Sequence, residues 1–275
     1  IPLDFLNRPG RWKKQKNKAK KEAEKYVQSL IKTYSERELV FSEPWEVGGE
    51  MISSFVDNFE HKDTPDQARC WEDIKKDLCE KSPMNRLVCG DVGFGKTEIA
   101  IRASFLATIN NKQTVILAPT TILTSQLYQS FAKRLGSFGV NVGFLSTLSN
   151  DKSFIIDSFL NKKIDVLIGT SSLLFQKDIL ARCGLFVVDE EHRFGVRDKE
   201  LVFSFNPYVH FLSLSATPIP RSLQFSLNNV RSISLMQTPP VERRPIICFS
   251  SDFNIKTIVG SILKELNRGG QVFFV

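Results

Sequence analysis

Short apolar runs alternate with helix-like patterns over the central part of the chain. Between the runs, apolar residues recur at helical spacing, as in residues 123–135 and 154–160. Strands that are apolar along most of their length and separated by helices are typical of a parallel sheet. The chain is therefore predicted to be α/β, with a mostly parallel sheet covered by helices on both faces. The predicted strands span residues 87–89, 114–118, 142–146, 165–169, 185–189 and 211–215.

A glycine-rich stretch follows the first apolar run. Gly90 is followed after four residues by Gly95, Lys96 and Thr97, which is the spacing of a phosphate-binding loop. Gly90, Gly93 and Gly95 tolerate backbone angles that let successive N–H groups point at phosphate oxygens. The following helix adds partial positive charge at its N-terminus. We predict that these glycines bind nucleotide phosphate, that Lys96 reaches the β- and γ-phosphates and that Thr97 holds Mg²⁺. The alternative is a glycine-rich turn with a chance Lys-Thr pair.

Polar residues follow most of the other predicted strands. Ligands of parallel sheets bind at the carboxyl ends of the strands. These polar groups are therefore expected to converge on the edge that carries the phosphate loop. They are Pro119, Thr120 and Thr121; Gly169, Thr170 and Ser171; Asp189, Glu190, Glu191 and His192; and Ser215, Ala216 and Thr217.

Two adjacent acids after a strand are the candidate hydrolytic pair. Asp189 is expected to hold Mg²⁺, usually through water, and Glu190 to orient and deprotonate the attacking water. Such a pair is also common in solvated loops, but the phosphate loop upstream favours hydrolysis. Together with Lys96 they form the predicted catalytic set. His192 is either a metal ligand or, as we prefer, a link between the nucleotide site and the loop that contains Ser215 and Thr217.

A capped helix is predicted shortly before the phosphate loop. Thr64 is expected at the N-cap and Pro65 at the first helical position. Gln67 is either a surface residue or a reader of adenine, because its amide offers both a donor and an acceptor to the base. Phe59 is a candidate for stacking on that base. Residues 35–63, with a proline and a Gly-Gly pair, are predicted to be a linker with short helical turns.

Charge and composition suggest four segments. Residues 1–40 read as a basic amphipathic helix, either a solvated arm or a connector near nucleic acid; residues 41–63 as a linker; and residues 64–238 as an ATP-binding lobe. The Pro- and Arg-rich stretch 228–245 also has linker composition. Residues 239–275 are expected to contain a linker and the cut-off start of a second α/β lobe, with strands at 246–250 and 272–275 and a helix at 255–266 between them. The formal net charge of +7 makes a polyanionic partner plausible.

The chain has five cysteines without a C-x-x-C pair, and no apolar run approaches the ~20 residues of a membrane span. We expect reduced core cysteines, no cysteine metal site and a cytoplasmic protein that does not enter a membrane. The sequence begins without Met and ends in an apolar run, so we expect a piece of a longer protein.

The phosphate loop, the Asp-Glu-Glu-His motif and Ser-Ala-Thr together resemble those of superfamily 2 nucleic-acid motors. Within that group, residues 90–98 (Gly-Asp-Val-Gly-Phe-Gly-Lys-Thr-Glu), 189–196 (Asp-Glu-Glu-His-Arg-Phe-Gly-Val) and 217–221 (Thr-Pro-Ile-Pro-Arg) resemble bacterial transcription-repair coupling factors. The resemblance runs from the basic helix to the end of the chain. The related branch-migration helicase RecG shares 217–221, but typically has Ser in place of Phe94 and Gln in place of Glu191.

The resemblance implies a RecA-like first motor lobe in an ATP-dependent translocase on double-stranded DNA. Its partners would be stalled RNA polymerase and nucleotide-excision repair proteins, bound through domains outside this chain. Ser215 and Thr217 would couple hydrolysis to lobe movement. Arginines of the second lobe would lie beyond residue 275, so the chain alone is expected to hydrolyse ATP weakly. The implied DNA-backbone contacts are Pro119, Thr120, Thr121, Gly169 and Thr170.

The chain departs from the family pattern in three places. Ser171 and Ser172 replace a His and a basic residue, and residues 146–148 (Ser-Thr-Leu, with Thr147 at the centre) replace Ser-Arg-Phe. Asp198 replaces a His. The first two changes remove positive charge from the expected DNA side, which would weaken binding and lower its salt dependence. A nucleotide- and DNA-binding lobe without catalysis is the alternative function for the chain alone.

Overall fold

A parallel sheet of seven strands organises the first part of the chain, in the order β3-β4-β2-β5-β6-β1-β7. Every neighbouring pair among the described strands is parallel, which confirms the predicted sheet. The computed structural model describes residues 40–146, 149, 151–217, 231–240, 248, 250 and 252–274. The strands are β1 (Asn85–Gly90), β2 (Gln113–Leu117), β3 (Val142–Leu145), β4 (Val166–Gly169), β5 (Cys183–Val188), β6 (His210–Ser215) and β7 (Ser232–Met236).

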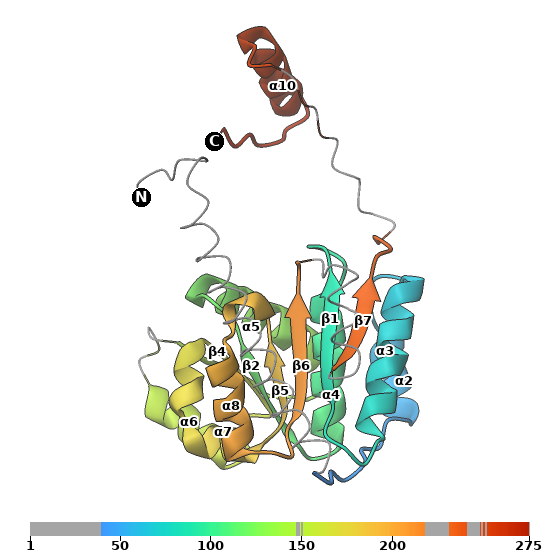
Figure 1. Cartoon of the computed structure of the whole chain (residues 1–275), viewed down its shortest axis with the longest axis vertical. Coiled ribbons are helices and arrows are strands. Elements are labelled where there is room, and N and C mark those ends of the chain that lie inside the picture. The colour runs from blue at the N-terminus through green and yellow to red at the C-terminus, as the bar shows by residue number, and fades with distance from the viewer. Residues whose placement is uncertain are drawn as a thin grey trace, which may run out of the picture. The chain divides into compact units, whose positions relative to one another are not determined.

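Helices cover both faces of this sheet (Figure 1). One face is covered by α2 (Glu50–Asp57), α3 (Pro65–Leu78), α4 (Lys96–Ile109) and α5 (Thr121–Gly136). The other face is covered by α6 (Lys152–Leu160), α7 (Lys177–Arg182) and α8 (Val196–Phe205). Two short 3₁₀ helices, η1 (Ser171–Phe175) and η2 (Glu191–Arg193), follow β4 and β5. The predicted three-layer α/β arrangement is therefore confirmed.

Successive side chains of each strand point to opposite faces of the sheet, and this divides the apolar core into two clusters. On β5, Leu185 and Val187 pack into the cluster beneath α3, α4 and α5, whereas Phe186 and Val188 pack into the cluster beneath α6, α7 and α8. Successive side chains of a strand point to opposite faces of the sheet, so a strand covered on both sides must be apolar throughout. This is the physical reason for the continuous apolar runs in the sequence.

The start of α3 is fixed by a capping box. The Thr64 hydroxyl accepts a hydrogen bond from the Gln67 backbone N–H (3.2 Å), and Oε1 of Gln67 accepts one from the Thr64 N–H (2.8 Å). Pro65 occupies the first turn. The predicted cap is confirmed, and it uses the side chain of Gln67.

Two stretches interpreted as linkers are instead part of the folded lobe. Within residues 41–63, α2 forms, and Trp45, Ile52 and Phe55 are buried in the core with α4. Within residues 228–245, β7 pairs with β1 along the edge of the sheet. The prolines that follow β7 and the two serines within it masked the strand signal. Ser232 is exposed at the edge of the sheet and Ser234 is buried.

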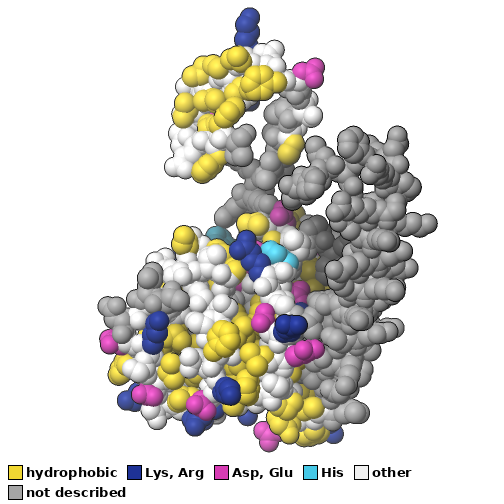
Figure 2. Space-filling model, turned by 60° about the vertical axis from the view of Figure 1, so that its left-hand side comes forward, with side chains coloured by type: hydrophobic (Ala, Val, Ile, Leu, Met, Phe, Trp, Pro, Cys, Tyr) yellow, Lys and Arg dark blue, Asp and Glu magenta, His cyan; other side chains and the backbone are white. Residues whose placement is uncertain are grey.

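The chain divides into two compact units between Pro240 and Val241. The second unit contains α10 (Ile255–Asn267), which confirms the predicted helix. Figure 2 shows hydrophobic side chains gathered along this unit, and the exposed apolar residues of α10 are Ile255, Val259, Leu263 and Leu266. Residues 270–274 carry no strand, contrary to the prediction, since a strand needs a hydrogen-bonded neighbour.

Several predictions concern residues that the structure leaves undescribed. They are most of the basic arm 1–40, Thr147 and Leu148, the greater part of 217–221, and most of the strand predicted at 246–250.

The cysteines are all unpaired, as expected, but only Cys70, Cys89 and Cys183 are buried. Cys79 and Cys248 are exposed and are therefore not core residues. Over the described ranges, no helix has the length and apolar character needed to cross a membrane.

Candidate active site

The predicted site residues lie at the carboxyl edge of the sheet. Gly90 ends β1, Gly169 ends β4 and Ser215 ends β6. Asp189 follows β5 directly, and its N–H donates to the carbonyl oxygen of Leu117 at the end of β2 (2.9 Å). Because all these strands run in the same direction, the loops that follow them share one edge.

The phosphate loop turns through two left-handed glycines. Gly93 has φ 80° and Gly95 has φ 82°, and Gly95 is the N-cap of α4. Gly90, which was predicted only to tolerate unusual angles, lacks a positive φ; a Cβ there would lie 2.9 Å from Cβ of Met236 on β7. Lys96 Nζ donates to the carbonyl oxygens of Gly90 (2.7 Å) and Asp91 (3.0 Å). Its ammonium group is thus held over the loop.

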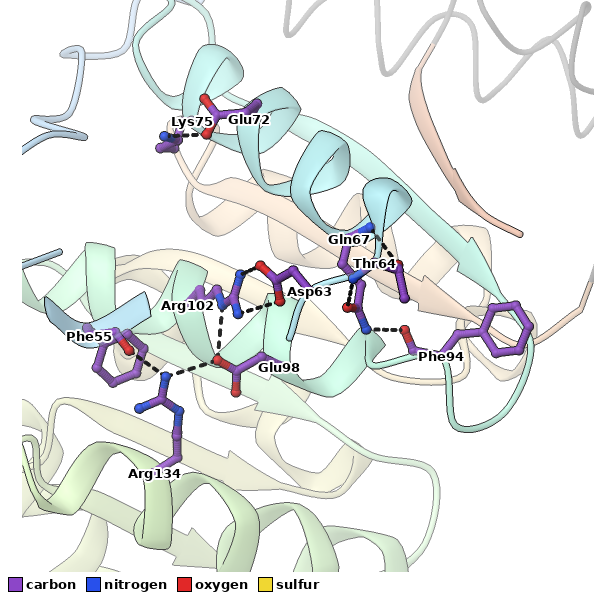
Figure 3. A network of polar contacts seen from close by, with 10 residues as sticks. All are labelled: Phe55, Asp63, Thr64, Gln67, Glu72, Lys75, Phe94, Glu98, Arg102 and Arg134. Carbon is purple, nitrogen blue, oxygen red and sulfur yellow. Dashed lines mark hydrogen bonds and ion pairs between the residues drawn. The ribbon is translucent and has the colours of Figure 1, made fainter. Parts of the chain in front are cut away.

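Gln67 connects the α3 cap to the phosphate loop (Figure 3). Its Nε2 donates to the carbonyl oxygen of Phe94 (2.9 Å), while its Oε1 is used by the Thr64 N–H. The Gln67 side chain is buried. In this arrangement the amide holds the loop, and its predicted contact with adenine stays a prediction.

Phe59 packs against two arginines. Its ring centroid lies 5.3 Å from Cζ of Arg102 and 5.6 Å from Cζ of Arg134. Arg102 also binds Asp63 and Glu98, and Arg134 donates to Glu98 (3.2 Å) and to the carbonyl oxygen of Phe55 (Figure 3). The structure therefore places Phe59 on this network, and its predicted stacking on a base remains untested.

The two candidate catalytic acids are adjacent and differ in backbone conformation. Glu190 has φ 55° and ψ 59°, in the left-handed region that residues with a Cβ seldom adopt. Its N–H donates to Oδ1 of Asp189 (3.1 Å). Oε2 of Glu190 is buried, accepts no hydrogen bond from the described residues, and lies 3.4 Å from Nδ1 of His192. His192 thus contacts the acid itself, and its link to the Ser215 loop stays a prediction.

The charges of the loop and the acids influence each other. Burial lowers the pKa of Lys96, although the carboxylates of Glu190 and Asp189 oppose that shift. Burial and the neighbouring Glu190 raise the pKa of Asp189, and Lys96 opposes it. Lysine and both carboxylates therefore lie within electrostatic range in a partly dehydrated site, where perturbed pKa values are typical of functional groups.

A third acid, Glu191, is held by two cations that the sequence did not reveal. Lys199 Nζ on α8 and Arg231 Nη1 (2.5 Å) both donate to Oε1 of Glu191. Burial alone would raise the pKa of Glu191, but Arg231 and Lys199 outweigh it and hold the pKa at about 2. No spacing rule joins residues 191, 199 and 231, so only the fold brings them together.

Hydroxyl groups at the strand ends bond mainly to their own loops. The Ser215 and Thr217 hydroxyls are 2.8 Å apart, and those of Thr170 and Ser172 are 3.2 Å apart. Thr120 is the N-cap of α5, accepting from the Leu123 N–H. Pro119, Thr121 and Gly169 lie at the same edge, and the DNA contacts of this group remain predictions. Asp198 caps the start of α8 by accepting from the Gly195 N–H (2.9 Å).

The chain that forms this site is similar to known helicases and coupling factors. Residues 64–225 match the family described as DEAD/DEAH box helicase. The chain is 42% identical over 266 residues to the transcription-repair-coupling factor of Borreliella burgdorferi, covering 96% of this chain and 24% of that protein. It is 40% identical over 266 residues to that of Bacillus subtilis, covering 96% of this chain and 23% of the relative. The resemblance to coupling factors is thereby confirmed.

A solved structure agrees with this result. The structure of RecG bound to a three-way DNA junction superposes with a TM-score of 0.75 and 30% sequence identity, covering 90% of this chain and 34% of that chain. The chain spans about a quarter of the length of the curated relatives it matches. The family match covers more than half of the chain and includes the phosphate loop, both acids and the Ser215 loop. The chain therefore belongs to the DEAD/DEAH box helicase family.

Proposed function

We propose that this lobe binds ATP with Mg²⁺ and supplies the groups that hydrolyse it. The observation that carries the proposal is the convergence of two loops at the carboxyl edge of the parallel sheet: the phosphate loop with Lys96 after β1, and the loop with Asp189 and Glu190 after β5. Lys96 neutralises phosphate charge, while the backbone N–H groups between Gly90 and Thr97 surround the phosphates.

The donor groups of the site suit Mg²⁺. Oxygen ligands are what this ion prefers, and Thr97 and Asp189 would supply a hydroxyl and a carboxylate. The buried Oε2 of Glu190, without a hydrogen bond from the described residues, fits a group that meets a water molecule. When bound, Mg²⁺ would offset phosphate charge. Glu190 would orient the attacking water and accept its proton.

For the whole protein we propose ATP-dependent translocation along double-stranded DNA, directed at stalled RNA polymerase in transcription-coupled repair. The support is identity of about 40% to proteins named transcription-repair-coupling factor across nearly the whole chain. The hydroxyls of Thr120, Thr121 and Thr170, with Pro119 and Gly169, would meet the DNA backbone. RNA polymerase and nucleotide-excision repair proteins would bind through other domains.

A branch-migration helicase is the second candidate, because the RecG complex superposes well on this chain. Two features favour the first candidate. Phe94 and Glu191 are present where RecG typically has Ser and Gln, and the identity to the coupling factors is higher than to RecG. The chain alone is proposed to bind nucleotide with little turnover, because the arginines that complete such sites belong to a second lobe.

The test measures ATP hydrolysis by the full-length protein with and without duplex DNA. Glu190→Gln should keep ATP binding and lose turnover by roughly 100-fold or more, and Lys96→Ala should weaken binding itself. Glu72→Gln, on the exposed side of α3, is the matched control and should behave as wild type. Full turnover by Glu190→Gln would refute the catalytic assignment.

A second assay separates the two candidate activities. The full-length protein is given ATP with either a polymerase stalled on DNA or a branched DNA junction. Release of the polymerase without junction processing supports the first candidate. Junction processing alone would overturn it in favour of branch migration.

A further inference from the structure

The Glu191 carboxylate is the meeting point of three separate parts of the fold. A single oxygen, Oε1, accepts hydrogen bonds from Lys199 Nζ and Arg231 Nη1. The side chains of Lys199 and Arg231 are each 5% exposed, and that of Glu191 is 17% exposed. These three residues form what we term the Glu191 triad, which is largely shielded from water. Shielded pairs are screened by salt much less than surface pairs.

Each member of the Glu191 triad comes from a different element. Glu191 begins η2 after β5, Lys199 lies in α8, and Arg231 immediately precedes β7. Arg231 Nη2 also lies 3.5 Å from the carbonyl oxygen of Arg86 on β1, the strand that leads into the phosphate loop. The triad thus joins the loop of the catalytic acids to the strands on the phosphate-loop side of the sheet.

The residue next to the triad has a strained backbone. Glu190 adopts the left-handed conformation, which is unfavourable for a residue with a Cβ. Such a conformation persists only when its surroundings impose it. On one side the Asp189 N–H is fixed to Leu117, and on the other the Arg193 N–H donates to the Glu190 carbonyl oxygen (2.9 Å). The Glu191 side chain supplies the tertiary anchor of this turn.

We propose that Glu191 is a positioning residue: through Lys199 and Arg231 it holds Glu190 in the conformation that aims its carboxylate at the attacking water. The inference rests on the proposed hydrolysis of ATP at this site. Glu191 is not itself a catalytic residue, because two cations already occupy its carboxylate oxygen. A misplacement of about 1 Å at a reacting group lowers rates by up to roughly 100-fold. Releasing the anchor is therefore expected to slow the chemical step and to leave ATP binding intact.

The experiment uses the full-length protein with duplex DNA and compares kcat, KM for ATP and affinity for a non-hydrolysable ATP analogue. Glu191→Gln keeps the size of the side chain and removes its charge. We expect kcat to fall about 10- to 100-fold, with KM and analogue affinity within about threefold of wild type. Lys199→Arg, which keeps the cation, should retain most of the activity. Glu200→Gln, at the adjacent exposed position of α8, is the control.

A second variant covers the case in which Glu191→Gln does not fold. Lys199→Met removes one cation, leaves the pair of Glu191 with Arg231, and should also lower kcat more than it changes KM. The inference is overturned if the folded variants keep wild-type kcat, or if kcat falls only in proportion to lost analogue binding.

Glu190→Gln separates this result from failure of the proposed function. If Glu190→Gln is inactive while Glu191→Gln is fully active, only the positioning role is wrong. If Glu190→Gln remains active, the proposed site itself is wrong.

Discussion

The guanidinium group of Arg102 on α4 and the carboxylate of Asp63 are joined by two hydrogen bonds of 2.6 and 2.8 Å. Asp63 immediately precedes Thr64, the N-cap of α3, and α4 begins at the phosphate loop. Arg102 is buried and also donates to Glu98 (3.0 Å). This contact fixes the segment that carries Gln67 to the helix that carries Lys96.

Replacing Arg102 with Met should destabilise the lobe strongly. The change leaves Asp63 without its bidentate partner and removes one of two cations from the buried Glu98, and breaking such a buried pair costs about 3–5 kcal/mol. Urea unfolding followed by circular dichroism measures the loss. Lys133→Met breaks an exposed pair with Glu60, in which the two side chains are 77% and 71% exposed, and should leave the unfolding midpoint close to that of wild type. Equal losses for the two variants would contradict the assigned role of Arg102.

The two left-handed glycines of the phosphate loop should respond differently to alanine. Gly93→Ala and Gly95→Ala both force a Cβ into positive φ, which costs roughly 1–2 kcal/mol. Only at Gly95 would the Cβ also collide with Nε2 of Gln67, at 2.3 Å; nothing lies within 4 Å at Gly93. Titration with a fluorescent ATP analogue should show a larger loss of affinity for Gly95→Ala, by about tenfold or more. An equal loss of affinity in both variants would mean that backbone strain alone, and not the collision with Gln67, weakens nucleotide binding.

The sequence predicted the carboxyl edge of the sheet because each of its motifs follows an apolar run. Lys96 follows β1 at a fixed spacing, and Asp189 comes directly after the last residue of β5. Because the strands are parallel, the loops that follow them necessarily lie at the same edge of the sheet. The cap of α3 was equally visible, since Thr64 stands directly before Pro65 at the start of a helical pattern.

Contacts between residues far apart in the chain could not be predicted from the sequence, because no local pattern encodes them. Arg231 lies 40 residues from Glu191, and its sequence surroundings resemble a surface linker. Trp45 packs against the ring of His210 on β6, and Phe55 stacks on Phe105 of α4, so both are buried by residues far away in the sequence. Gln67 was expected to face a base, and its role in holding the Phe94 carbonyl depends on how closely α3 approaches the loop.

The five cysteines should divide into two classes of reactivity. Burial raises the pKa of Cys70 and Cys183 to about 12 and that of Cys89 to about 11, and only the thiolate reacts with disulfide reagents. Exposed Cys79 and Cys248 should react rapidly in the native protein, and the other three only after unfolding. A colorimetric thiol titration with and without denaturant measures this. A variant with Ser at both exposed positions should lose the fast phase; if the fast phase remains, the burial pattern is wrong.

Asp66 on α3 should make the stability of the lobe sensitive to acid. Its Oδ2 accepts hydrogen bonds from the N–H groups of Gln237 (2.9 Å) and Thr238 (2.8 Å), which follow β7. Burial by itself would raise the pKa of Asp66, but these N–H groups outweigh it, so the pKa lies below 3.8 in the folded state. A carboxyl group whose pKa is lower in the folded state than in the unfolded state stabilises the folded protein at pH values above the unfolded-state pKa. That contribution is lost as the pH falls below 3.8 and through the lower folded value.

Asp66→Asn should therefore remove part of this pH dependence. At about pH 6 the variant is expected to unfold at lower urea concentration than wild type, because the charged acceptor of two N–H groups is lost. As the pH falls below 3.8 the difference should shrink, because protonation of the wild-type carboxylate removes the same advantage. Glu72→Gln, at an exposed position of the same helix, controls for the general effect of removing a carboxylate. A difference between wild type and Asp66→Asn that stays constant over this range would show that the contact between α3 and β7 does not depend on the charge of Asp66.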